Sequence, residues 1–200
     1  MTLSDQLAAA NESNRAQLTA PALSVMDRAS AALAATDPAA GAVSVGDTAP
    51  LFALPNAIGQ TVRLGDLLAQ GPVVLSFYRG GWCPYCSLEL KALQDALPAI
   101  TEAGARLVAV SPQTPDATLS TSEKKALSFD VLSDVGNAVA RQYGLVFEVP
   151  ADLVATYQGF GIDLEAANGD ASHELPMPAT FVIDIDGTEV GRTYEALRLV

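Results

Sequence analysis

Two thiols that lie close together in the chain are the residues with the clearest chemical potential. Cys83 and Cys86 are its two cysteines, and Pro84 and Tyr85 separate them. Thiols at this spacing can react as a redox pair or ligate a metal ion. A disulfide between them would close a very short loop, which removes little entropy from the unfolded chain and makes a weak structural staple. A reactive role is therefore the better interpretation of the pair.

A metal-binding role would need more ligands than the sequence offers. A closed zinc site takes four ligands, and His173 is the only histidine available to join the two cysteines. Such a site would need a second subunit, and His173 itself is expected at the surface. We therefore expect no metal and no cofactor. A redox-sensing interaction module, or a metal bridge between subunits, stays open as the non-enzymatic alternative.

The position of the pair predicts that one of its sulfurs ionises readily. Proline is favoured at the first helical position, so Pro84 would place Cys83 at the N-cap and Cys86 at the third helical position. The free N–H groups of the first turn would point toward the Cys83 sulfur, and the helix dipole would favour its thiolate. A thiolate is the nucleophile for disulfide exchange and for attack on a peroxide.

A strand before the pair and a helix after it would hold it in place. Residues 72–78 form a nearly continuous apolar run, typical of a central strand that is covered on both faces, and Gly80-Gly81 ends it. The helix after the pair has one apolar face, and Pro98 is expected to kink or shorten it. Further strands are predicted at 60–64, 105–110, 130–132, 180–184 and 189–192, and further helices at 114–127 and 137–143. This order predicts an α/β fold with a central mixed sheet flanked by helices.

Residues 1–44 precede this pattern and are expected to form an N-terminal helical extension. Apolar residues recur at helical spacing in its second half, where Pro21 can open a helix at its first turn. Residues 45–200 form the predicted main domain. Within it, residues 145–176 show no clear pattern and are interpreted as an insertion made of a loop with at most a short helix.

Composition and charge limit the partners of the chain. Half of its 200 residues are apolar, and its formal net charge is -12. Such a charge should repel nucleic acid and anionic membrane surfaces. No apolar run reaches the roughly 18 residues of a transmembrane helix, and no basic region followed by an apolar run marks a signal peptide. We therefore expect a cytoplasmic protein that binds neither nucleic acid nor membranes.

The segment around the cysteines resembles a known family. Residues 77–90 are similar to the active-site segment of the peroxiredoxins, within the alkyl hydroperoxide reductase/thiol-specific antioxidant (AhpC/TSA) family. Segments 46–55, 108–112 and 178–184 also fall where that family has its own, so the resemblance covers roughly residues 45–190. It implies a thioredoxin-like fold and a thiol-dependent peroxidase that reduces hydrogen peroxide or organic hydroperoxides through a Cys83/Cys86 redox-active disulfide. It also implies a thioredoxin- or glutathione-type reductant and allows a homodimer.

The resemblance and the helix position disagree about the nucleophile. Peroxiredoxins carry a Pro-x-x-x-Thr-x-x-Cys motif that ends in the peroxide-attacking cysteine, and this cysteine falls on Cys86. The Thr falls on Cys83, the Pro on Arg79 and the family's later catalytic Arg on Pro178, whereas Glu89 keeps the pattern. The resemblance favours Cys86, and the start of the helix favours Cys83. Both assignments stay open, with a disulfide between the two in either case.

Other nearby residues point toward a second function. Arg79 could lower the pKa of a thiol or bind an anion, and Trp82 and Tyr85 could either form an apolar rim or pack internally. Met177-Pro178 looks like the cis-proline loop of thioredoxins, which accepts an extended substrate chain; an ordinary trans proline at a strand start is the alternative. Cys-Pro-Tyr-Cys also resembles a glutaredoxin centre. These features support a thioredoxin/glutaredoxin-like thiol–disulfide oxidoreductase with little peroxidase activity.

Overall fold

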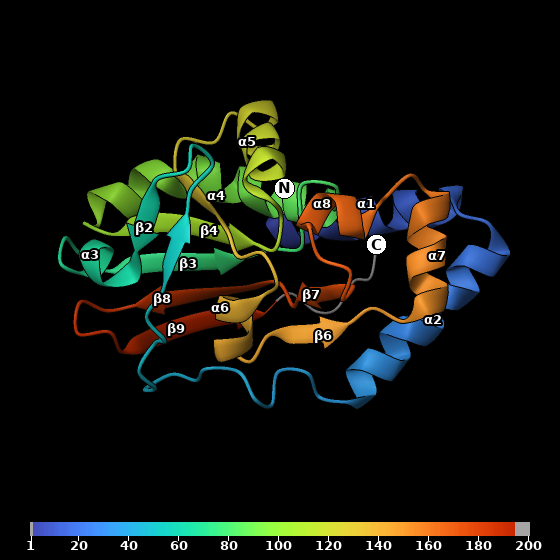
Figure 1. The fold of residues 1–200 in the computed structure, drawn as a ribbon, viewed down its shortest axis with the longest axis horizontal. Helices are drawn as coiled ribbons and strands as arrows, with labels where there is room; N and C mark the ends of the chain where they lie inside the picture. Colours follow the sequence, from blue (N-terminus) through green and yellow to red (C-terminus); the bar gives the residue numbers. More distant parts are fainter. Residues whose placement is uncertain (1, 195–200) are drawn as a thin grey trace.

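A five-stranded mixed sheet forms the centre of the molecule (Figure 1). The computed structural model describes residues 2–194. In spatial order the strands are β5 (Asp130–Ser133), β4 (Arg106–Ser111), β3 (Val73–Phe77), β8 (Ala179–Ile183) and β9 (Glu189–Tyr194). The central strand β3 runs parallel to β4 and antiparallel to β8. Its burial on both faces explains the nearly continuous apolar run, and the predicted mixed α/β sheet is confirmed.

Helices connect and cover these strands. They are α3 (Leu64–Leu68), α4 (Pro84–Glu102), α5 (Pro115–Lys124) and α6 (Ala138–Gln142). The crossovers from β3 to β4 and from β4 to β5 run through α4 and α5, as parallel neighbours require. Pro98 was expected to kink or shorten the helix; it does not shorten it, because α4 continues to Glu102. Pro98 is exposed, so its ring faces solvent while the rest of the helix packs on the sheet.

The segment 145–176 is ordered, which corrects its interpretation as a loop with at most a short helix. It contains β6 (Val146–Glu148), α7 (Ala151–Gly159), α8 (Leu164–Asn168) and β7 (Glu174–Pro176). Strands β6 and β7 pair with each other in an antiparallel arrangement, apart from the main sheet. A second small pair is formed by β1 (Ala53–Pro55) and β2 (Thr61–Arg63). Strand β2 corresponds to the strand predicted at 60–64, whereas the short elements of segment 145–176, such as the three-residue β6 and the nine-residue α7, show no clear periodicity.

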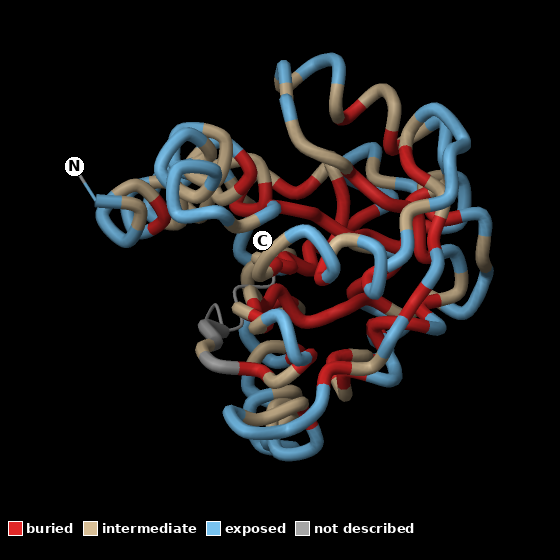
Figure 2. The backbone as a smooth tube through the Cα atoms, turned by 90° about the vertical axis from the view of Figure 1, so that its left-hand side faces the viewer, coloured by how far each residue is buried: buried red, intermediate tan, exposed pale blue. Residues whose placement is uncertain are grey.

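Two helices precede the first strand, as predicted for the N-terminal extension. Helix α1 (Leu3–Gln17) packs against α4, and α2 (Ala20–Ala35) packs against α7. The second contact includes an ion pair of 2.7 Å between Arg28 and Asp152. Figure 2 shows that burial is concentrated along the sheet, whereas the outer faces of the helices are exposed. Within residues 2–194, no helix is long and apolar enough to cross a membrane.

The buried side chains form two clusters. The larger one includes an aromatic group in which the Tyr143 ring lies 5.0 Å from Phe77 and 5.2 Å from Phe181. The smaller one contains both cysteines, with apolar residues of α1, α4 and the central strands around them. The thiols therefore lie inside the protein, between the sheet and the helices that cover it.

Candidate active site

The loop between β3 and α4 brings the chain sharply from the sheet to the cysteines. Tyr78 N–H donates to the Val110 carbonyl at 2.9 Å, which extends the sheet pairing by one residue. Gly80 then has a φ of +154°, and a Cβ there would collide with the Trp82 indole. The Cys83 N–H donates to the Gly80 carbonyl at 3.1 Å and closes the turn. This turn places the cysteine directly after the C-terminal edge of β3.

Helix α4 begins where the sequence predicted. Cys83 is its N-cap in an extended conformation, and Pro84 follows as the first helical residue. The Cys86 N–H donates to the Cys83 sulfur at 3.4 Å, so a backbone donor of the first turn faces this Sγ atom. Both cysteines are free thiols. One turn of helix therefore holds the two thiols as interacting neighbours.

Arg79 supplies the positive charge beside the Cys83 sulfur. Its Nη2 donates to Cys83 Sγ at 3.3 Å, and the whole side chain is only 3% exposed. A guanidinium is always charged in proteins, so it brings a fixed positive charge into a site without bulk water. Arg79, which the sequence analysis named as able to lower the pKa of a thiol or to bind an anion, is thus in contact with Cys83.

The surroundings of the two thiols shift their pKa values in opposite directions. Burial raises the pKa of Cys83, but the hydrogen bond from the Cys86 thiol, the charge of Arg79 and backbone N–H groups outweigh it and lower the pKa well below its ordinary value. Burial raises the pKa of Cys86, and the neighbouring Cys83 raises it further. Glu89 on α4 adds a smaller upward effect on Cys86. At neutral pH the pair is therefore a Cys83 thiolate beside a protonated Cys86.

Both sulfurs are enclosed. Cys83 and Cys86 are 0% exposed. An apolar rim of Trp82 and Tyr85 around an open site would leave the sulfurs more exposed than this. Tyr85 is buried and packs with the cysteines, and its hydroxyl donates to Asn11 Oδ1 of α1 at 3.2 Å. Trp82 is half-buried and packs against both clusters. A reactant can therefore reach the thiols only when the surrounding side chains move.

Tyr157 is a site residue that the sequence analysis missed. It comes from α7, in the segment without a pattern, and its ring lies 5.7 Å from that of Trp82. Its hydroxyl is buried and has no hydrogen-bond partner in the described part of the chain. Burial raises the pKa of Tyr157 to about 12, and its hydroxyl interacts electrostatically with Arg79 and both cysteines. A protonated phenol therefore lies within electrostatic range of the thiols and keeps a hydrogen to donate.

Pro178 does not form the predicted cis-proline loop. The Met177–Pro178 bond is trans, since the described chain contains no cis peptide bond. Met177 N–H donates to the Leu145 carbonyl at 2.8 Å, and Ala179 already pairs with Phe77 as the first residue of β8. The chain thus runs extended from β7 into β8, a course that a trans proline at the start of a strand follows without distortion.

The structure also describes the remaining candidate ligands and an apolar pocket. His173 is half-buried and its carbonyl accepts from Val149 N–H; within residues 2–194 no cluster of His, Cys, Asp or Glu could hold a metal ion.

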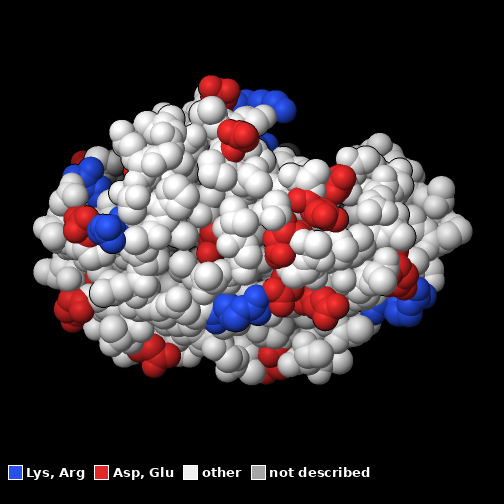
Figure 3. All heavy atoms as spheres, viewed as in Figure 1, with Lys and Arg blue, Asp and Glu red and all other residues white. Residues whose placement is uncertain are grey.

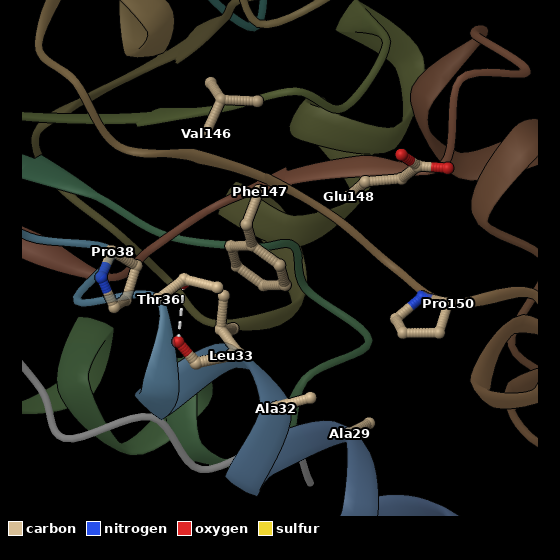
Figure 4. A pocket seen from close by; sticks show the side chains of 9 residues that line it. All are labelled: Ala29, Ala32, Leu33, Thr36, Pro38, Val146, Phe147, Glu148 and Pro150. Atoms are coloured by element: carbon tan, nitrogen blue, oxygen red, sulfur yellow. Dashed lines mark hydrogen bonds between the residues drawn. The ribbon is translucent and has the colours of Figure 1, made fainter.

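A pocket of about 370 Å³ lies between α2 and β6, with the Phe147 ring directed into it (Figure 4). Its lining includes none of the predicted site residues, so it is separate from the thiol centre.

Comparison with known proteins identifies a sequence family and related proteins. Residues 45–188 match the sequence model of the AhpC/TSA family. The chain is 31% identical over 146 residues to "Peroxiredoxin Q, chloroplastic" of Gentiana triflora, an alignment that covers 73% of this chain and 57% of that protein. It is 30% identical over 145 residues to "Peroxiredoxin Bcp" of Escherichia coli K12, which covers 72% of this chain and 81% of the relative.

A solved structure extends the likeness to the fold. The crystal structure of peroxidoxin BcpB from Mycobacterium tuberculosis superimposes with a TM-score of 0.64 at 26% identity, covering 78% of this chain and 88% of that one. The chain spans a little over half the length of several curated plant relatives that it matches.

Replacing Arg79 tests the electrostatic account of the thiolate. In Arg79→Gln the thiolate loses its guanidinium, so the pKa of Cys83 should rise by about one pH unit or more, and the thiolate should form at higher pH than in the parent. Thiolate absorbance at 240 nm against pH measures this. Arg79→Lys should keep part of the effect, and Arg106→Gln, at an exposed arginine bound to Gln70, should change nothing. Unchanged titration in Arg79→Gln would contradict the account.

Proposed function

This chain belongs to the AhpC/TSA family, and from that membership we propose that it is a thiol-dependent peroxidase that works through Cys83 and Cys86. The observation that carries the proposal is the enclosed Cys83 sulfur, held by Arg79 and by the first turn of α4. Relatives named as peroxiredoxins support the same activity. A hydroperoxide needs a smaller opening to reach this enclosed sulfur than a protein disulfide does.

In the proposed first step, the Cys83 thiolate attacks one oxygen of the hydroperoxide. The S–O bond forms as the O–O bond breaks, and the departing oxygen takes up a proton and leaves as an alcohol, or as water from hydrogen peroxide. The sulfur loses two electrons and becomes a sulfenic acid, while the peroxide gains them. The Cys86 thiol then attacks this sulfenic sulfur, so that the disulfide forms and a water molecule leaves.

Cys83 is our choice of nucleophile, although the family motif aligns Cys86 with the attacking cysteine. Its sulfur accepts from both Arg79 and the Cys86 N–H, and its pKa is lowered, whereas the pKa of Cys86 is raised. The thiolate is the reactive form, so the two positions differ in their readiness to attack. Cys86 then acts as the resolving thiol, which must lose its proton to attack. Once Cys83 is a neutral sulfenic acid, its negative charge no longer raises the pKa of Cys86.

Two donors would replace the threonine and arginine that the family motif has and this chain lacks. Arg79 already contacts the Cys83 sulfur, so its guanidinium can also bind the developing charge on the departing oxygen. The buried Tyr157 hydroxyl has no partner in the described chain, a state that costs about 1–3 kcal/mol unless another group accepts its hydrogen bond. A peroxide oxygen between Tyr157 and Cys83 would be that acceptor.

The enclosure of the pair favours this function over thiol–disulfide exchange. A protein disulfide must meet the attacking sulfur directly, and neither sulfur reaches the surface. The trans Met177–Pro178 bond also removes the substrate-binding loop that the thioredoxin comparison suggested. We propose a thioredoxin- or glutathione-type thiol as the reductant of the disulfide, which must become more accessible once it has formed.

Single cysteine variants separate the two roles. Cys83→Ser should lower the rate of peroxide consumption by about 100-fold or more, because the thiolate is lost. Cys86→Ser should still react once with peroxide and stop at a sulfenic acid on Cys83. Stopped-flow fluorescence of Trp82, the only tryptophan, follows the first step, and a sulfenic-acid reagent with mass spectrometry locates the product. A sulfenic acid on Cys86 formed at the parental rate in Cys83→Ser would overturn the assignment.

Removal of one hydroxyl tests the role of Tyr157. Tyr157→Phe should lower the second-order rate with hydrogen peroxide by about tenfold or more, while the pKa of Cys83 stays at its parental value. Tyr143→Phe is the matched control, because Tyr143 is also buried but its hydroxyl donates to the Pro50 carbonyl at 3.0 Å. That control should keep the parental rate. Equal rates in Tyr157→Phe and the parent would exclude the hydroxyl from peroxide binding.

A further inference from the structure

A second pocket, of about 280 Å³, lies next to the redox motif. It is open to solvent between α5 and α8, where the surface is hollowed at the top of the view in Figure 3. Its lining residues are Gly81, Trp82, Gln113, Ala117, Ser120, Thr121, Lys124, Lys125 and Ala167. Gly81 and Trp82 immediately precede Cys83, so this pocket borders the turn that carries the reactive sulfur.

The pocket is cationic in an acidic protein. The chain has three lysines and a formal net charge of -12, yet Lys124 and Lys125 both line this pocket. The third lysine, Lys91, is bound to Asp95 on α4 at 2.7 Å. No Asp or Glu is among the lining residues in the part of the chain that the structure describes. This charge distribution favours an anion in the pocket and disfavours a cation.

Hydrogen bonds connect the pocket to the thiol centre. Lys125 Nζ donates to Ser87 Oγ at 2.7 Å, and Ser87 Oγ donates to the Cys83 carbonyl at 2.9 Å. On the other side, the Gly81 N–H donates to Gln113 Oε1 at 2.8 Å. A molecule held at Lys125 would therefore rest on the same backbone turn that positions Cys83.

The pocket is distinct from the place proposed for the peroxide. The peroxide would lie between Cys83, Arg79 and Tyr157, and Tyr157 belongs to α7. The lysines belong to the end of α5, and Trp82 is the residue common to both places, since it contacts the Tyr157 ring and also lines the pocket. The arrangement thus offers one position for an oxidant and another for a second substrate.

We propose that this pocket binds the carboxylate of a small thiol that reduces the Cys83–Cys86 disulfide, an inference that rests on the proposed function. Lys124 and Lys125 would hold the carboxylate by charge-assisted hydrogen bonds. The volume lies close to the lower end of small-molecule pockets, roughly 300–1,000 Å³, and suits a molecule of a few residues rather than a protein surface. The thiol end would point past Trp82 toward the disulfide.

The reduction is a two-step exchange. The thiolate of the bound molecule attacks one sulfur of the protein disulfide, so a mixed disulfide forms and the other protein sulfur leaves as a thiolate that takes up a proton. A second small thiol then attacks the mixed disulfide. Two small thiols become one small disulfide, and the protein pair regains two electrons. At neutral pH one proton stays on Cys86, Cys83 returns as a thiolate, and the second proton goes to solvent.

Lysine variants and two thiols test this proposal. The protein is oxidised to its disulfide with diamide, which makes the assay independent of peroxidase activity, and reduction is followed with glutathione or with the neutral 2-mercaptoethanol. Lys124→Gln should lower the rate with glutathione by about three- to tenfold and leave 2-mercaptoethanol unchanged. Lys91→Gln removes the same charge elsewhere and should leave both rates unchanged. Lys125→Gln should show the same selectivity as Lys124→Gln.

Several outcomes would overturn the inference. An equal fall with both thiols in Lys124→Gln would mean that the substitution only disturbs the turn of Cys83, and no fall with either would leave the lysines without a role. A fall confined to a carboxylate-bearing hydroperoxide, such as linoleic acid hydroperoxide compared with cumene hydroperoxide, would assign the pocket to the oxidant. A fall confined to a protein dithiol would assign it to a protein partner. If the parent protein consumes no peroxide, while the lysine variants still lose rate with glutathione and not with 2-mercaptoethanol, the proposed function alone would be refuted.

Discussion

A negatively charged sulfur inside the protein is the constraint on which the rest of this structure depends. Burial of an isolated charge is very unfavourable, so the Cys83 thiolate requires compensation within bonding distance. The guanidinium of Arg79 at 3.3 Å and the N–H of Cys86 at 3.4 Å provide it. Because Arg79 lies in the loop after β3 and Cys86 in the first turn of α4, the sulfur, its charge partner and its backbone donor are fixed together by one short stretch of chain.

The fold is arranged around this requirement. Strand β3 lies in the middle of the sheet and delivers the loop to the interior, where Gly80 permits a turn that a side chain would block. Helix α1 covers the start of α4 through buried Leu7 and through the Asn11 contact with Tyr85. Helix α7 brings Tyr157 against the Trp82 ring. Exclusion of water from the thiols thus depends on elements at both ends of the chain, and enclosure strengthens each electrostatic contact in the site.

Local rules predicted the centre of the site well and its surroundings poorly. The proline at the first helical position was enough to place Cys83 at the N-cap, and apolar runs located the strands of the sheet. The role of Tyr157 had no such signal, because it depends on the packing of a nine-residue helix whose neighbours are distant in sequence. The bond before Pro178 was also decided by distant contacts, namely the pairing of Met177 with Leu145 and of Ala179 with Phe77. The burial of both sulfurs followed from α1, whose position on α4 no local pattern encodes.

Competitive alkylation of the unmodified protein tests the central claim most directly. The reduced chain is treated with a substoichiometric amount of iodoacetamide over a range of pH, and mass spectrometry locates the label. The account predicts that Cys83 is labelled first, at a pH well below the value of about 8.5 at which a free cysteine ionises, while Cys86 remains unlabelled. Label on Cys86 first, or none on either thiol until the ordinary pKa is reached, would contradict it.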